Sequence, residues 1–358
     1  MSTETPTKKA LQRLRSSFGR GGGGATTSQS LPVEGELPSF EGATQWINSK
    51  PITREELSGR VVLVCFGTYT CINWIRALPY VRAWAEKYAG NGLVVIGVQT
   101  PEFEFEGSLD NVHHAVEQMD VSFPLVVDNE YAIWRAFDNN YWPALYFIDA
   151  GGQIRHHHYG EGDYEESERV LQTLLAGTGP GVMKERANVD TALVRLEPQG
   201  VELPADWENL GSAENYVGYT RTEGFSSPGG LVPGEPNVYR TPSSLRLNEW
   251  ALSGDWRIGA VAAVSEGPGG VISCRFHARD LHLVMRPAMG QASTSFRVRI
   301  DGGSPGDSHG TDVDENGTGV LMDQRMYQLL RQPGPIIDRL FEIEFVDAGV
   351  EAYVFTFG

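Results

Sequence analysis

The feature that most constrains this chain is the alternation, over residues 31–176, of short apolar segments with segments of helical pattern. Two of the apolar segments, VVLVCF at 61–66 and LVVIGV at 93–98, contain no charged residue. Strands that are buried on both faces of a parallel sheet have this composition, and helices between such strands indicate βαβ units. We therefore expect an α/β domain. The expected strands are Val61–Phe66, Leu93–Gln99, Leu125–Val127, Ala144–Asp149 and Ile154–Tyr159, and the expected helices are Ile72–Tyr88, Leu109–Met119, Tyr131–Phe137 and Glu165–Leu175.

The pattern changes beyond the Gly- and Pro-containing segment AGTGPG at 176–181. In SFRVRI at 295–300, apolar residues alternate with arginines, as in a strand with one face buried. Several such strands separated by turns are typical of an antiparallel β-sandwich. A helix is expected in this half only around Met326–Leu330. We predict a disordered tail over 1–30, the α/β domain over 31–180, a linker over 181–210 and a β-sandwich domain over 211–358.

Charge and cysteine content narrow the classes of function. The 358 residues carry a formal net charge of −17, with a pI near 4.9, which argues against nucleic acid and anionic membrane as partners. No apolar segment approaches the roughly 20 residues that a membrane-spanning helix needs. Three cysteines do not form a disulfide framework. The N-terminus lacks the apolar core of a secretory signal, and we expect a cytoplasmic protein.

The segment FGTYTCINW at 66–74 contains the candidate reactive group. Cys71 is expected at the N-terminus of a helix, where free N–H groups and the helix dipole favour a thiolate. Cysteines in such positions often have a lowered pKa. Thr68 and Thr70 are expected to donate hydrogen bonds to the thiolate, and Pro79 is expected to kink the helix.

Nearly the whole chain beyond the tail resembles the thioredoxin-like (redoxin) proteins of the cytochrome-c-biogenesis type, as in the C-terminal portion of DipZ-like proteins. The resemblance implies a thioredoxin-like domain followed by a jelly-roll domain of carbohydrate-binding-module shape. The segments that carry it are FGTYTCINWIRALPYVRAWAEKY, VIGVQTPEFEFEGSLDNV, PLVVDNEYAIWRAF, YWPALYFIDAGGQIRHHHYGEG, LNEWALSGDW, FHARDLHLV and GVEAYVFTFG.

The same resemblance assigns roles to individual residues. Cys71 corresponds to the attacking cysteine of the family's C-x-x-C motif, whereas Trp74 occupies the position of the resolving cysteine. Cys65 occupies the position of a buried carboxylate that assists the resolving thiol. Trp142 and Pro143 correspond to the cis-proline loop that holds the substrate beside the reactive sulfur.

Three hypotheses follow for the function of Cys71. In the first, Cys71 alone attacks a disulfide, a peroxide or another electrophile, and an external thiol regenerates it. The TYTC segment also resembles the T-x-x-C of peroxiredoxins, with Thr68 as the hydroxyl partner and Arg76 or Arg135 as the cation. No cofactor is required.

The second hypothesis is a non-catalytic binding module, in which Trp74 and Trp142 form an aromatic wall for a small molecule or a peptide. The third is a specialised enzyme that captures a sulfur-containing or electrophilic metabolite at Cys71. In each case the sandwich is expected to pack against the first domain or to mediate a homodimer.

Other motifs suggest metal or sugar binding. The segment from Asp312 to Asp323 matches part of the ligand spacing of a calcium-binding EF-hand loop. The histidines of 156–158 alternate in direction along a strand and cannot converge on one metal ion. Trp207, Trp250, Trp256 and Tyr239 form either a sugar-stacking surface or part of a sandwich core. The candidate calcium ligands are Asp312, Asp314, Asn316 and Asp323.

Overall fold

The computed structural model describes residues 31–177 and 189–358. The predicted tail over 1–30 and residues 181–188 of the predicted linker lie outside the described residues. Val33–Gly358 form one compact unit, which contains an α/β part followed by an all-β part. Within the described ranges, no helix is both long enough and apolar enough to cross a bilayer.

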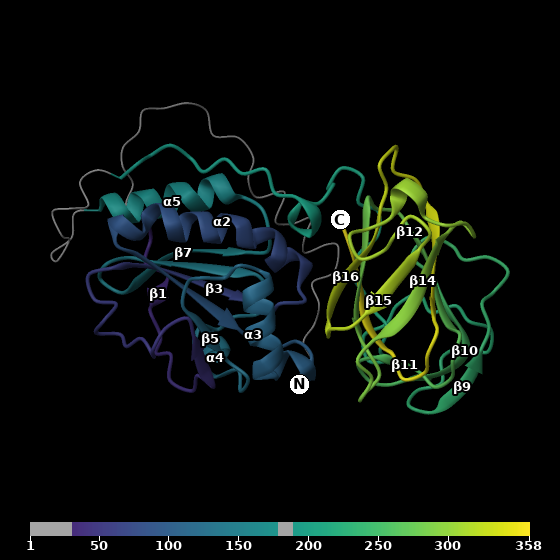
Figure 1. Ribbon diagram of the computed structural model, residues 1–358. Coiled ribbons are helices and arrows are strands. Elements are labelled where there is room, and N and C mark those ends of the chain that lie inside the picture. Colours follow the sequence, from purple (N-terminus) through teal and green to yellow (C-terminus); the bar gives the residue numbers. More distant parts are fainter. Residues whose placement is uncertain (1–30, 178–188) are drawn as a thin grey trace. The chain divides into compact units, whose positions relative to one another are not determined.

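A seven-stranded sheet forms the centre of the α/β part, in the order β1-β7-β6-β3-β4-β5-β2 (Figure 1). The strands β3, β4 and β5 are parallel to one another, and β6 and β7 extend the sheet in antiparallel fashion. Every residue of β3 is buried, as its uninterrupted apolar sequence predicts. The strands are β1 (Gly35–Glu36), β2 (Gln45–Ile47), β3 (Val61–Gly67), β4 (Leu93–Gln99), β5 (Leu125–Val127), β6 (Ala144–Ile148) and β7 (Gln153–Tyr159).

Helices cover both faces of this sheet. The helices α2 and α5 lie next to each other (Figure 1), and the rings of Tyr80 and Tyr164 stack between them with centroids 3.8 Å apart. On the other face, Ile133 and Phe137 of the α4 region pack against the even-numbered residues of β3. The helices are α2 (Ile72–Tyr88), α3 (Leu109–Gln118), α4 (Ala132–Ala136) and α5 (Tyr164–Ala176), and the 3-10 turns of this part are η1 (Ala89–Asn91) and η2 (Glu104–Gly107).

The all-β part is a curled sheet of 11 strands in which every pairing between named strands is antiparallel. Strand β10 joins its two halves: Trp250–Ser253 pair with β12, whereas residues from Gly254 onward pair with β9 and β11. Gly254 has φ +95°, a conformation that favours glycine, and it marks this change of partner. The arrangement is consistent with a sandwich.

The all-β part runs from β8 to β18. Its strands are β8 (Asn215–Tyr216), β9 (Pro236–Tyr239), β10 (Trp250–Ile258), β11 (Ala263–Ser265), β12 (Gly270–Phe276), β13 (Asp280–Arg286), β14 (Thr294–Ile300), β15 (Thr318–Leu321), β16 (Arg325–Arg331), β17 (Arg339–Phe345) and β18 (Glu351–Phe357). Two further 3-10 turns are η4 (Gly200–Glu202) and η5 (Gly306–Ser308).

Two sequence expectations for this half are resolved by the structure. The helix expected around Met326–Leu330 is wrong, because these residues lie in β16 and pair with β13. Its apolar run is that of a strand with both faces buried. Trp250, Trp256 and Tyr239 are at most 1% exposed and belong to the hydrophobic core, so they do not form a sugar-stacking surface.

Candidate active site

Cys71 is the N-cap residue of α2, directly after the loop that leaves β3. Its backbone N–H donates to the carbonyl of Thr68, and its own carbonyl accepts the first helical bond, from Ile75. The side chain is half-buried and makes no capping bond. The N–H groups of Asn73 and Trp74, at the helix start, favour the thiolate. The sequence expectation for the position of Cys71 is therefore confirmed.

The expectation of a lowered thiol pKa is wrong. Burial raises the pKa of Cys71 above its ordinary value, and the negative charges of Glu214 and Glu102 raise it further. These effects outweigh the helix-terminal N–H groups, which act in the opposite direction. At neutral pH the resting group is consequently a protonated thiol.

A tryptophan–proline loop lies beside the sulfur. The Trp142–Pro143 peptide bond is cis, and the Sγ atom of Cys71 lies 3.7 Å from the carbonyl oxygen of Trp142. The indole N–H of Trp142 donates to the carbonyl of Thr100 at 3.1 Å, and its ring packs on that of Trp134 with centroids 4.4 Å apart. The expected pairing of this loop with the reactive cysteine is therefore formed.

Thr68 and Thr70 are both buried, and their hydroxyl groups bond to other partners. The Thr68 hydroxyl accepts a hydrogen bond from the amide of Gln99 at 2.9 Å. The Thr70 hydroxyl donates to the Oε1 atom of Glu106 at 2.5 Å. The two threonines fix the loop before Cys71, and they are not placed as direct donors to its sulfur.

Trp74 points into the protein interior, which corrects the expected aromatic wall. It is 4% exposed, and its indole lies on Gly67, where a Cβ atom would collide with the ring. Its indole also lies beside the Cys65 thiol and lowers the pKa of that thiol, against the larger opposite effect of burial. Trp74, at the position that the resemblance assigns to a resolving cysteine, thus fills core space and is closed to a ligand.

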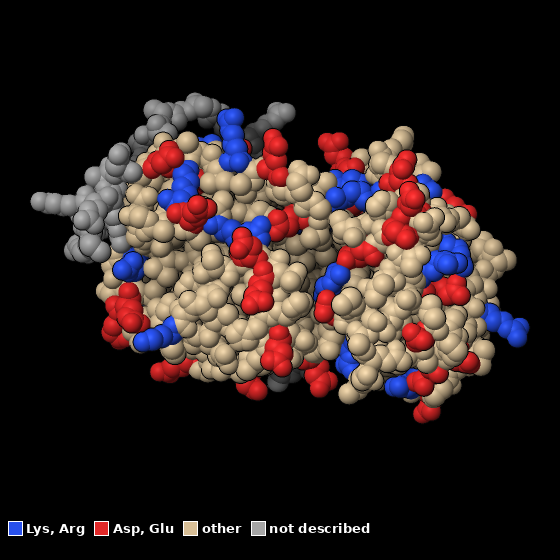
Figure 2. Space-filling view, viewed as in Figure 1, with Lys and Arg blue, Asp and Glu red and all other residues tan. Residues whose placement is uncertain are grey.

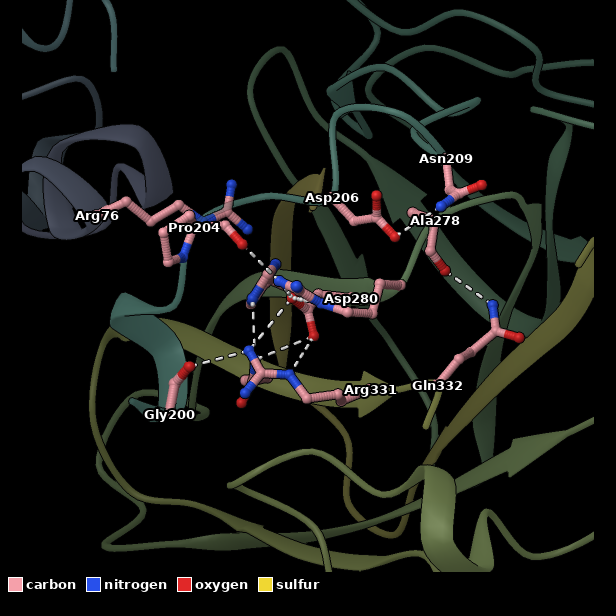
Figure 3. A network of polar contacts seen from close by, with 12 residues as sticks. Arg76, Gly200, Pro204, Asp206, Asn209, Ala278, Asp280, Arg331 and Gln332 are labelled. Carbon is pink, nitrogen blue, oxygen red and sulfur yellow. Dashed lines mark hydrogen bonds and ion pairs between the residues drawn. The ribbon is translucent and has the colours of Figure 1, made fainter. Parts of the chain in front are cut away.

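Arg76 does not supply the expected cation for Cys71. Its side chain is 1% exposed and forms an ion pair with Glu161 at 3.2 Å. Its guanidinium packs against Gly358, whose backbone bonds to Asp280. Figure 3 shows the side chain extending from α2 toward the network of Asp280 and Arg331. The helical spacing of five residues turns Arg76 away from the N-cap side chain.

The remaining candidate groups lie apart from the sulfur of Cys71. Arg135 is exposed on α4 and forms no ion pair with a described residue. Cys65 and Cys274 are buried in β3 and β12, and burial raises the pKa of each thiol to about 12. No described cysteine is therefore placed to accept a disulfide from Cys71.

Sequence reasoning missed a group of polar side chains that includes Glu102, Glu214, Tyr216 and Arg221, which we call the Glu102 network. The hydroxyl of Tyr216 lies 2.6 Å from Glu102 and 3.0 Å from Glu214. Arg221 donates to Glu102 at 2.8 Å, and its guanidinium carbon lies 3.3 Å from the Tyr216 ring centroid. The acidic PEFEFE segment at the end of β4 was the available signal, because β3 and β4 are parallel and end at one edge.

Three of the four expected calcium ligands are engaged with protein groups, and the fourth, Asn316, is exposed in the same turn. Asp312 forms an ion pair with Arg325 at 2.6 Å, and Asp314 accepts backbone N–H bonds within its own turn. Asp323 faces Arg325 and His114. Among the described residues, no group of three or more His, Cys, Asp or Glu side chains is arranged to hold a metal ion. The spacing reflects turn formation in this segment.

Comparison with known proteins agrees with this description. Residues 33–157 match the AhpC/TSA family, and residues 212–358 match the thioredoxin like C-terminal domain. Thiol-disulfide oxidoreductase YkuV of Bacillus subtilis is 31% identical over 143 residues, which are 40% of this chain and 95% of that protein. Protein DipZ of Mycobacterium tuberculosis is 37% identical over 254 residues, 70% of this chain and 35% of DipZ. The chain thus spans about a third of the length of the DipZ proteins that it matches.

Solved structures include a thioredoxin-like protein in its oxidised form, 30% identical, that covers 40% of this chain and is itself covered to 95%, with a TM-score of 0.37. The fold and the N-cap cysteine beside a proline loop define a thioredoxin-like protein. The chain belongs to the thioredoxin-like family, with an AhpC/TSA domain followed by the family's C-terminal domain.

Proposed function

We propose that the protein is a thiol-dependent oxidoreductase that reacts through Cys71 alone and is regenerated by an external thiol. The observation that carries the proposal is the position of the Cys71 sulfur. It is half-buried at the N-terminus of α2 and 3.7 Å from the Trp142 carbonyl of the proline loop. The relative YkuV is named a thiol-disulfide oxidoreductase, which supports the same class of reaction.

The proposed reaction begins when the Cys71 thiol loses its proton and the thiolate attacks one sulfur of a disulfide RSSR. A bond forms between Cys71 and one R–S group while the S–S bond breaks, and the departing RS⁻ takes up a proton. A second, external thiol then attacks the mixed disulfide and releases reduced Cys71 together with a new disulfide. A peroxide substrate would instead oxidise Cys71 to a sulfenic acid, which external thiols reduce in two steps.

The arrangement of the other residues supports a one-cysteine reaction. The position three residues after Cys71 is occupied by the buried Trp74, and the buried Cys65 and Cys274 belong to strands. Reduction of a mixed disulfide on Cys71 therefore requires a thiol from outside the chain. Under this proposal the protein works in a reducing compartment such as the cytoplasm, where such thiols are present.

The raised pKa of Cys71 lowers the expected rate of thiol–disulfide exchange at neutral pH. Thiol–disulfide exchange requires the thiolate, so a protonated resting thiol makes the uncatalysed encounter slow at neutral pH. A thiolate of high pKa is intrinsically more nucleophilic, which offsets part of this loss. We therefore expect Cys71 to react slowly with disulfides free in solution and faster with a substrate that is held against the Trp142–Pro143 loop.

The test is turnover of bis(2-hydroxyethyl) disulfide with thioredoxin, thioredoxin reductase and NADPH as the source of electrons. We expect the intact protein to increase NADPH consumption above the rate without it, and Cys71→Ser to abolish the increase. Cys274→Ser removes a buried thiol elsewhere and should retain the activity. Equal activity of Cys71→Ser and the unaltered protein would refute the proposal, and so would the absence of any increase.

A further inference from the structure

The Glu102 network lies at the reactive sulfur and contains more acidic than basic groups. Glu102 and Glu214 provide two carboxyl groups, whereas Arg221 provides one guanidinium. Arg221 is engaged on both sides, since it binds the Glu102 carboxylate and covers the Tyr216 ring. Its charge is thus balanced within the network, and Glu214 is left without a cationic hydrogen-bond partner among the described residues.

Two short connections place Glu102 beside Cys71. The buried carboxylate of Glu106 accepts two hydrogen bonds, each with a length of 2.5 Å. One comes from the hydroxyl of Thr70, the residue before Cys71, and the other comes from the backbone N–H of Glu102. On the other side, the indole of Trp142 bonds to Thr100, two residues before Glu102. The carbonyl of the same tryptophan contacts the Cys71 sulfur.

Glu214 belongs to the all-β part and directly precedes β8. Tyr216 joins it to Glu102 through one hydroxyl group, at 3.0 Å and 2.6 Å. The charges of Glu214 and Glu102 both act on the Cys71 thiol and raise its pKa. Burial and the neighbouring charge of Glu102 raise the pKa of Glu214 to about 7, so at pH 8 most of this carboxyl group carries its negative charge.

We propose that Glu102 and Glu214 are specificity-determining residues that select the electrophile of Cys71 by charge. Disulfides that carry amino groups are favoured, neutral disulfides react at an intermediate rate, and disulfides that carry carboxylates are repelled. This inference rests on the proposed function, since it presumes that Cys71 attacks a disulfide. The second domain would then complete the active site by supplying Glu214.

The physical basis is electrostatic focusing at a partly buried site. An unpaired carboxylate near the reaction centre raises the local concentration of cations and lowers that of anions, and salt weakens the effect. Attack by Cys71 forms the Cys71–S–SR bond, breaks the S–S bond and expels RS⁻, so a cationic R group also stabilises the negative charge that develops on the leaving sulfur.

The experiment measures, by mass spectrometry of the full chain, the rate of adduct formation at Cys71 with three disulfides: cystamine, bis(2-hydroxyethyl) disulfide and 3,3′-dithiodipropionate. Each rate is divided by the rate of the same reagent with N-acetylcysteine amide, which removes intrinsic reactivity. At low salt and pH 8, we expect the normalised rate of cystamine to exceed that of dithiodipropionate by roughly 10-fold, and about 0.5 M salt to remove most of this ratio.

Variants then assign the effect to its residue. Glu214→Gln should lower the ratio at least about threefold, and Glu214→Lys should favour the anionic reagent. Glu315→Gln makes the same charge change in an exposed turn and should leave the ratio unchanged. A ratio near one in the unaltered protein, or the same ratio in Glu214→Gln, would overturn the inference while leaving the proposed function intact. If the neutral disulfide gives no adduct at Cys71, the proposed function itself fails.

Discussion

Trp74→Cys restores the second cysteine of the motif, and its effect on stability follows from the structure. Trp74 is 4% exposed and its ring lies on Gly67. Replacement of a buried tryptophan by alanine costs roughly 3–5 kcal/mol, and a cysteine retains one heavy atom more. We therefore expect the reduced variant to lose about 3 kcal/mol of unfolding free energy.

Oxidation of Trp74→Cys to the disulfide should recover part of the lost unfolding free energy. Residues three apart at a helix start have Cβ atoms about 5–6 Å apart, within reach of a disulfide after small adjustment. Closing a four-residue loop stabilises by about 2 kcal/mol in the chain-entropy model. The oxidised variant should consequently be about 1 kcal/mol less stable than the unaltered protein, and it should gain activity as a dithiol reductase.

The assay is urea unfolding of Trp74→Cys under reducing and oxidising conditions, together with thiol counting by mass spectrometry. Trp84→Cys is the matched control, because Trp84 is also buried on α2, with an unpartnered indole nitrogen. It lies 13 residues from Cys71, or about 20 Å along the helix. The control should lose similar stability and form no disulfide. Equal stability of the reduced Trp74→Cys variant and the unaltered protein, or a failure to oxidise, would refute the reasoning.

Three further predictions follow from the structure. Alkylation of Cys71 should accelerate about tenfold per pH unit from pH 7 to beyond pH 9, because its raised pKa keeps the thiol protonated throughout this range; a plateau below pH 8 would contradict it. Asp280→Asn should lower the unfolding free energy by roughly 3–5 kcal/mol in urea titrations, since Asp280 is fully buried and binds Arg279 and Arg331. Burial lowers the pKa of His282 from 6.5 to about 3. The unfolded chain therefore binds a proton there before the folded protein does, and stability should fall as the pH drops from 6.5 toward 3; His282→Asn should flatten this part of the pH profile.

The local features of the site could be read from the sequence. The β3 segment is apolar throughout, the helix pattern begins at Ile72, and the Trp142–Pro143 pair follows the family arrangement. The first two features depend on the pattern of neighbouring residues, and the third depends on a family motif that is present in this sequence. The fold class of both parts could therefore be predicted, with the error at β16, whose apolar run does not distinguish a short buried strand from a helix.

The electrostatics of Cys71 depend on long-range contacts that local patterns do not encode. Glu214 lies 143 positions from Cys71 in the sequence and raises the pKa of its thiol from the other domain. The orientation of Trp74 was missed for a similar reason, since it depends on the space above Gly67. Figure 2 shows acidic and basic side chains interspersed over the visible face, so net charge alone gives no indication of the local imbalance at one sulfur.

Peptide-resolved mass spectrometry shows whether Cys71 is the one reactive sulfur and has no resolving partner in the chain. The reduced protein is treated with bis(2-hydroxyethyl) disulfide, freed of reagent, and analysed before and after addition of an external thiol. We expect one hydroxyethyl-thiol adduct, at Cys71, that persists until the thiol is added and then disappears. An adduct at Cys65 or Cys274 in place of Cys71, or spontaneous conversion to an intramolecular disulfide, would contradict it.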